Sequence, residues 1–184
     1  MRRPLVLVAV LLVVGCVGCG GAEAEPVAPS QAAEPQRAEL GWLERYPETG
    51  PGLRFAVEWL EVSKDGWSAE IAVTNATGIP FELSGGGIDL QYGLMLFATG
   101  DLGELEEAAR DGTLPPPRLA TELVPEPPEL LSPNESWRTT ISAPGPLADG
   151  SYVRVSFGPL RAQGEPPEGM EPVVVWITDR SYRL

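Results

Sequence analysis

The sequence lacks histidine altogether, and it contains one lysine and two cysteines among 184 residues. Histidine is the base of Ser-His-Asp and Cys-His catalysis and a common ligand of zinc and copper, so those kinds of site are excluded. Cys16 and Cys19 both lie near the N-terminus, which leaves the rest of the chain without a disulfide or a thiolate metal site. The single lysine, Lys64, stands beside Asp65 in a turn-forming stretch, which argues against a catalytic base. We therefore predict no catalytic residue, no metal and no cofactor.

Basic residues are scarce as well: 13 Lys and Arg stand against 26 Asp and Glu, which gives a formal net charge of −13. A surface of this sign repels phosphate backbones and anionic lipid headgroups, so we expect no nucleic-acid partner. Carboxylates are abundant, and a glycoside hydrolase needs two of them on facing walls of a cleft. The spacing of the acids marks no such pair, so a carboxylate-dependent hydrolase is kept only as an alternative to a non-catalytic protein.

One unbroken apolar run is present, over residues 5–14, and it follows Arg2 and Arg3. A bilayer span needs ~20 apolar residues, so the run is too short to cross and has the length of a signal-peptide core. It leads into Val13-Val14-Gly15-Cys16, which resembles the lipobox of bacterial lipoprotein signal peptides. The resemblance implies cleavage before Cys16 and a diacylglyceryl group on its thiol. Cys19 is the less favoured site, and an ordinary secretory signal is the remaining alternative.

This resemblance implies that residues 1–15 are a signal peptide. The mature chain would then be held by fatty acids, such as palmitate, to a membrane on the extracytoplasmic side of the cell envelope. Loss of the two N-terminal arginines would change the formal charge from −13 to −15.

A segment of low complexity follows the predicted cleavage site. Residues 16–39 are rich in Gly, Ala, Glu and Pro, a composition that cannot bury a core, so we predict a disordered tether behind the lipidated cysteine. Residues 40–184 then form the folded domain. At its start Trp42 and Tyr46 stand four positions apart, which predicts a short helix or a docking segment that packs against the domain.

The stretch from Leu53 to Val73 has the pattern of a β-hairpin. Apolar residues alternate with polar or small ones on both arms, as in half-buried strands, and Ser63–Gly66 supplies turn-forming residues between them. Leu60 and Val62 break the alternation, which predicts a β-bulge near residues 59–60 or burial on both faces. The residues expected to face inward are Leu53, Phe55, Val57, Trp59, Trp67, Ala69, Ile71 and Val73.

Further strands are expected along the remainder of the chain, and one helix is expected between an Asp101 cap and Gly112. The glycine run 85–87 lacks the spacing of a phosphate-binding loop. The polar stretch 158–170 is expected to be a loop. The expected strands cover residues 81–83, 88–98, 119–124, 137–141, 152–157 and 173–178, with an extension over 181–184.

Short strands separated by turns indicate a mainly β fold, namely an immunoglobulin-like antiparallel β-sandwich of seven or eight strands with one short helix. Two segments resemble bacterial extracytoplasmic immunoglobulin-like domains. The stretch 131–137 is similar to their L-x-P-G-E-x-W lead-in, and 147–155 is similar to their L-x-x-G-x-Y-x-V pattern. Asn134 replaces the usual glycine in the first segment, and Arg154 stands where the second calls for an apolar residue.

The sequence names no ligand-binding residue. Its five tryptophans could form a sugar-stacking platform, but most lie on expected strands, where packing in the core accounts for them. The triplets that begin at Asn75 and Asn134 match a glycosylation motif and are interpreted as turns. We expect a non-catalytic protein-interaction or structural module with a protein partner in the cell envelope; the alternatives are a carbohydrate-binding module and, less favoured, the hydrolase. The tryptophans are Trp42, Trp59, Trp67, Trp137 and Trp176.

Overall fold

The computed structural model describes residues 31–84 and 90–184. The predicted signal peptide, Cys16, Cys19, the first part of the tether and the glycine run 85–87 lie outside these residues. The described chain forms twelve strands and one helix, and seven of the strands have five residues or more. The elements are β1 (Gln36–Tyr46), β2 (Gly52–Val62), β3 (Gly66–Ala76), β4 (Phe81–Glu82), β5 (Gly93–Phe97), α1 (Leu102–Asp111), β6 (Arg118–Leu119), β7 (Glu122–Val124), β8 (Leu130–Leu131), β9 (Ser136–Pro144), β10 (Tyr152–Ala162), β11 (Val173–Ile177) and β12 (Tyr182–Arg183).

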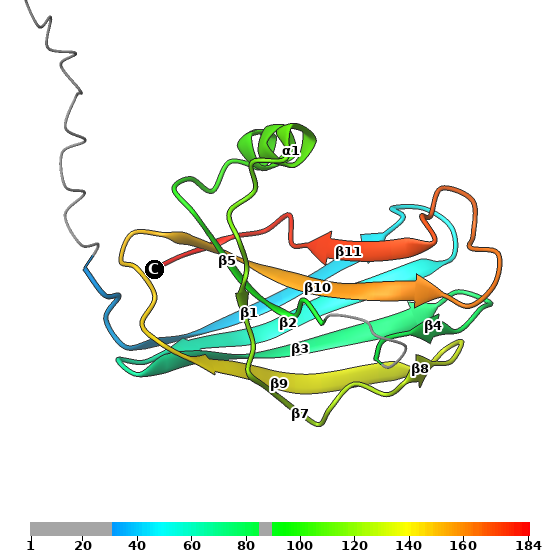
Figure 1. The fold of residues 1–184 in the computed structure, drawn as a ribbon, viewed down its shortest axis with the longest axis horizontal. Coiled ribbons are helices and arrows are strands. Elements are labelled where there is room, and N and C mark those ends of the chain that lie inside the picture. Colours follow the sequence, from blue (N-terminus) through cyan, green and yellow to red (C-terminus); the bar gives the residue numbers. More distant parts are fainter. Residues whose placement is uncertain (1–30, 85–89) are drawn as a thin grey trace, which may run out of the picture.

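The strands form two antiparallel sheets that pack face to face (Figure 1). The five-stranded sheet has the order β1-β2-β3-β9-β7. The seven-stranded sheet is built around β10, which pairs with β5 and β4 along one side and with β12 and β11 along the other. β6 and β8 complete it. The predicted mainly β sandwich with one short helix is confirmed.

The alternation of the central hairpin directs its apolar side chains into the core. Leu53, Phe55 and Val57 of β2 and Ile71 and Val73 of β3 are all buried between the sheets. Burial of a side chain of this size stabilises a fold by roughly 1.5–3 kcal/mol. The hydrogen bond from the Ser63 amide to the Gly66 carbonyl, at 2.8 Å, closes the predicted turn between the two strands.

The N-terminal region differs from the prediction. Residues 40–46 are not a helix: they belong to β1, an eleven-residue strand that pairs with β2 along its length. Residues 31–39 are not a disordered tether either, because β1 begins at Gln36 and the buried Ala33 donates its N–H to the Leu147 carbonyl at 2.8 Å. Pairing with a neighbouring strand satisfies the backbone here and outweighs the low apolar content.

Two other segments depart from expectation in the second half of the chain. The expected strand 119–124 is divided: β6 pairs with β5 in one sheet and β7 pairs with β9 in the other, so the chain passes between the sheets at residues 120–121. The expected loop 158–170 begins as strand, because β10 continues to Ala162 and buries Leu160.

The helix α1 has the predicted ends. The Asp101 side chain accepts a hydrogen bond from the Gly103 N–H at 2.7 Å, and Gly112 adopts the left-handed conformation, with φ of 67°, that ends the helix. Its packing is slight, since Leu105 is the buried residue of the helix and Leu102 is exposed. In Figure 1 α1 stands away from the two sheets.

Candidate functional site

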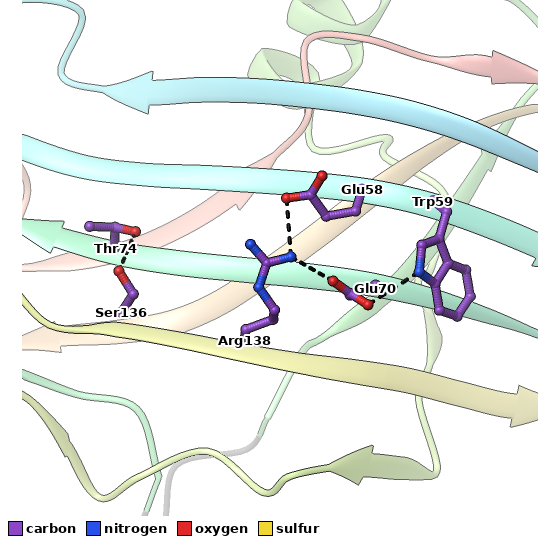
Figure 2. A network of polar contacts seen from close by, with 6 residues as sticks. All are labelled: Glu58, Trp59, Glu70, Thr74, Ser136 and Arg138. Carbon is purple, nitrogen blue, oxygen red and sulfur yellow. Dashed lines mark hydrogen bonds and ion pairs between the residues drawn. The ribbon is translucent and has the colours of Figure 1, made fainter.

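The outer face of the five-stranded sheet carries an ordered set of charged and aromatic side chains, and Figure 2 shows part of it, on β2, β3 and β9. They come from four neighbouring strands, β1, β2, β3 and β9. We call this set the outer-face network and define it by residues Arg37, Glu39, Glu58, Trp59, Glu61, Glu70 and Arg138.

A β-bulge places the tryptophan in this network. Val57 pairs with Ile71 and Trp59 pairs with Glu70, so Glu58 has no residue opposite it on β3. The extra residue reverses the side on which Trp59 would otherwise lie. The predicted bulge is confirmed, but the prediction that Trp59 faces the core is wrong. Its indole lies on the outer face and is half-buried among polar neighbours.

The neighbouring strand is irregular at the same level. The pairing of β1 with β2 shifts between Glu39 and Trp42, and Gly41 within this interval has φ of 55°. A residue with a side chain adopts that backbone conformation only at a cost, so glycine suits the position. The shift leaves Glu39 directly opposite Trp59.

The indole is held on two sides. Its Nε1–H donates to Oε2 of Glu70 at 3.2 Å, and the Arg37 guanidinium carbon lies 4.1 Å from the ring centroid, in cation–π geometry. Arg37 in turn donates to Glu39 and to Glu61, at 3.0 Å in each case. Trp59 is therefore fixed in orientation although it lies at the surface.

Arg138 of β9 joins the far side of the network. Its Nη1 atom donates to Oε1 of Glu70 at 2.5 Å and to Oε1 of Glu58 at 3.2 Å. Thr74 of β3 and Ser136 of β9 face each other two residues away from Arg138, and their hydroxyls are 2.7 Å apart (Figure 2). Hydrogen bonds between side chains thus link β2, β3 and β9 on their outer face.

The electrostatics of the network favour the ionised form of Glu70. The hydrogen bond from Arg138 lowers the pKa of Glu70, and the hydrogen bond from Trp59 acts in the same direction. Glu58 and Glu70 share one guanidinium nitrogen on an open sheet surface. A general acid needs a raised pKa, so Glu70 is poorly suited to donate a proton in glycoside hydrolysis.

A shallow hollow of about 230 Å³ adjoins the network. Glu70 and Arg138 form its charged wall, and Val124 and Pro125 of the β7 segment form its apolar wall. Val124 is one of the most exposed large apolar side chains in the described residues. The outer face therefore combines a rigid aromatic ring, both signs of charge and a small apolar depression.

The other four tryptophans do not belong to this surface, and all four lie within the described residues. Trp42, Trp67 and Trp137 are buried, as the core interpretation predicts. Trp176 stacks on Phe55, with ring centroids 5.4 Å apart and ring planes 5° apart. Its Nε1–H donates to the carboxylate of Glu44 at 2.9 Å. The five rings do not make an exposed coplanar platform.

The remaining residues that the sequence singled out have structural positions. Lys64 is exposed at the tip of the β2–β3 turn. Asn75 is buried and donates from Nδ2 to the carbonyls of Ile79 and Leu131, at 2.8 and 3.0 Å. Asn134 takes a positive φ of 66° in a turn. The turn predicted at Asn134 is confirmed, whereas Asn75 is the penultimate residue of β3, and the turn begins after it.

Within residues 31–84 and 90–184, no cluster of three or more Asp, Glu, His or Cys side chains is arranged to hold a metal ion. In the same described part of the chain, no helix combines the length and the apolar character needed to cross a bilayer.

The sequence showed Arg154 at a position that calls for an apolar residue but not its surroundings: it is fully buried on the outer side of β10. Its guanidinium donates to the carbonyls of Gly100, Asp101, Thr178 and Asp179. Desolvation lowers the pKa of Arg154, against the attraction of nearby acids. The signal in the sequence was its position between inward-facing valines, together with an insertion long enough to cover that face.

Sequence reasoning missed Glu44, which points from β1 toward the other sheet. Its carboxylate accepts hydrogen bonds from Trp176 Nε1 at 2.9 Å and from the amides of Asp179 and Arg180 at 3.0 Å each. Its partners lie more than 130 positions away in the chain, so no local pattern could reveal them.

The chain matches no protein-family model, no curated protein and no solved structure.

Proposed function

We propose that this chain is a lipid-anchored, non-catalytic β-sandwich of the extracytoplasmic cell envelope that binds another protein through the outer-face network. The observation that carries the proposal is the bulge at Glu58, which brings Trp59 to the surface between Arg37 and Glu70. A tryptophan that served only the core would gain nothing from this reversal. Bulges that redirect a side chain often occur at functional positions.

The composition of the network supports protein binding. Tryptophan and arginine are the residues most enriched among those that dominate the energy of protein–protein interfaces. Here Trp59 and both arginines are already ordered by contacts with carboxylates. A side chain that is fixed before binding loses less conformational entropy when the complex forms.

The distribution of charge indicates the kind of partner. The chain as a whole is strongly acidic, but the network sets two arginines among four glutamates. A partner that presents both signs of charge around an apolar side chain would match the network and the hollow beside Val124. Complementarity of this kind gives specificity and a fast association rate.

The anchor is supported by the lipobox-like segment that ends at Cys16. Metabolic labelling with a fatty acid should tag the wild-type protein, and Cys16→Ala should abolish the label. Label that persists in Cys16→Ala and disappears in Cys19→Ala would move the anchor to the second cysteine. Label that persists in both variants would contradict lipid anchoring at this segment.

Site-specific photo-crosslinking in the intact envelope tests the binding surface. A photoreactive residue at Thr140, on the wall of the hollow, should give one discrete protein adduct, and Trp59→Ala should remove that adduct. The same probe at Glu107, which is exposed on α1, is the matched control and should give no such adduct. An adduct that is indifferent to Trp59→Ala would refute the proposed surface.

The alternative functions predict different results. A carbohydrate-binding module would show quenching of tryptophan fluorescence by an envelope oligosaccharide, with the change lost in Trp59→Ala. A carboxylate hydrolase would cleave such an oligosaccharide and lose activity in Glu58→Gln or Glu70→Gln. Either result, without a protein adduct at Thr140, would replace the proposal.

A further inference from the structure

The strand β11 leaves one edge of the seven-stranded sheet open. Among the described residues it pairs with β10 and with no other strand. Its sequence, Val173 to Ile177, has no charged residue and consists of residues that favour strands. Val173 and Val175 keep 48% and 47% of their surface exposed.

The other long edge of the sandwich is protected against pairing with a foreign strand. β1 carries Arg37, Glu39 and Arg45 and is interrupted by its shift at Gly41. Charges and bulges on an edge are the usual devices that prevent unwanted strand addition. β11 lacks both kinds of charge, and an exposed apolar edge that is retained in a folded protein is a candidate docking surface.

An apolar groove adjoins this strand on the outer side of the sheet. Val175 and Ile177 form one wall, the prolines at 115–117 form the other, and Met95 also lines the groove, which has a volume of about 240 Å³. In a strand added beside β11, every second side chain would point to this same outer side. Those side chains would meet Val173 and Val175, and a long one would reach the groove.

The ends of β11 define the length and charge of what it can accept. At the far end, Glu44 occupies the amides of Asp179 and Arg180, so the open edge is limited to the strand itself. At the near end the loop before β11 carries the exposed carboxylates of Glu165, Glu168 and Glu171. An occupant with basic residues at this end would be attracted to the loop.

We propose that the open edge of β11 binds a short extended segment of another protein, with apolar residues at alternate positions and basic residues beside Glu171. Strand addition of this kind draws affinity from backbone hydrogen bonds and specificity from alternate side chains. The surface is on the other sheet from the outer-face network, so this inference is independent of the proposed function.

A second copy of the chain is a poorer occupant. In an antiparallel pair of β11 strands centred on Val175, Glu171 of one copy would face Asp179 of the other, and like charges directly opposite are destabilising. Each copy also has a formal charge of −13.

A fluorescent peptide tests this inference on the full-length protein in detergent. The peptide has two lysines followed by alternating valine and threonine. We expect saturable binding by fluorescence anisotropy, with affinity reduced about tenfold by Val175→Lys because a charged side chain replaces an exposed apolar contact. A peptide with glutamates in place of the lysines should bind about tenfold more weakly to the wild type, because the carboxylates of the loop before β11 would repel it.

Two variants are matched controls. Val124→Lys alters a valine on the other sheet that is more exposed than Val175, at 67% against 47%, and should leave peptide affinity unchanged, as should Trp59→Ala. Where Val175→Lys changes the circular dichroism spectrum, the double variant Val173→Thr, Val175→Thr replaces it and should weaken binding without adding charge. Equal loss of affinity in Val124→Lys, or no loss in the β11 variants, would overturn the proposal. A dimer in sedimentation that Val175→Lys dissociates would assign the edge to a second copy instead.

Discussion

Each of the two sheets carries an arginine on the outer side of an interior strand, and the two arginines differ in burial and in hydrogen-bond partners. Arg138 on β9 is exposed and ion-paired with Glu58 and Glu70. Arg154 on β10 is fully buried beneath the segment that leads into α1 and the segment that follows β11, and it donates to main-chain carbonyls.

This difference in burial predicts that the two arginines contribute differently to the stability of the fold. A charge in contact with water gains little from its ion pairs, because solvent screens them. The same charge in a dry environment depends on its hydrogen bonds, which Arg154 makes through Nη1 and Nη2 while its buried Nε has no partner. Removal of the side chain leaves the polar partners without those hydrogen bonds. We infer that Arg154 holds the fold together, whereas Arg138 contributes little to stability. Under the proposed function, Arg138 would pair with a partner instead.

The largest expected effect is the loss of Arg154. Arg154→Met should destabilise the protein by about 3 kcal/mol, because one buried and three partly buried carbonyls lose a donor. Arg138→Met is the matched control and should cost less than about 1 kcal/mol. Urea unfolding followed by circular dichroism measures both values. Equal losses in the two variants would refute the contrast between the sheets.

The next effect concerns Glu44, which connects the two sheets. Glu44→Ala should destabilise the fold by about 2 kcal/mol, since one indole and two amide donors lose their acceptor. Hydrogen exchange should speed up first at the amides of Asp179 and Arg180. Glu39→Ala, an exposed acid of the same strand, should leave both amides unchanged. Protection that survives Glu44→Ala would show that other contacts hold this segment.

A smaller effect is expected from Asp179, an acid near Arg154, whose contribution to stability should depend on pH. Desolvation, and then repulsion by Glu44, raises the pKa of Asp179 above its ordinary value of 3.8. The folded state therefore binds the proton more tightly than the unfolded state, and ionised Asp179 costs stability at neutral pH. Asp179→Asn should raise the melting temperature at neutral pH and lose this advantage in acid. A lower melting temperature at neutral pH would contradict the sign.

Glu70 should show the opposite trend and the smallest change. Its pKa is lowered from 4.5, mainly by Arg138. Its contribution to stability is therefore present at neutral pH and is lost as the pH falls through the folded-state pKa. Glu70→Gln should lower the melting temperature slightly at neutral pH and not at all in strong acid. A penalty that is independent of pH would indicate a steric cause.

The core hairpin could be predicted from sequence because its alternation is strong. Leu53, Phe55 and Val57 are large and apolar, and their neighbours are not, so one face is specified. β1 could not be predicted in the same way: its inward positions include Gln36 and Ala38, and Gly41 interrupts the pattern. Residues 36–46 form a strand because they pair with β2, and this pairing is a contact between strands that the local sequence does not specify.

The candidate site was predictable only in part. The change of parity at Leu60 indicated a bulge, but the sequence did not show whether Trp59 would remain on the core side. Arg154 was recognisable as an irregularity in an apolar strand. Its partners at Gly100 and Thr178 lie on distant segments, and only the folded chain brings them to the guanidinium.

The two lateral sides of the sandwich are closed by different kinds of bond. On one side the polypeptide itself crosses from β6 to β7, and on the other Glu44 and the stacked Trp176 connect β1 to β11. Covalent bonds do not break during thermal fluctuation, whereas hydrogen bonds do. Transient opening of the sandwich should therefore begin beside Glu44 and turn about the β6–β7 crossing, and solvent would first reach Phe55.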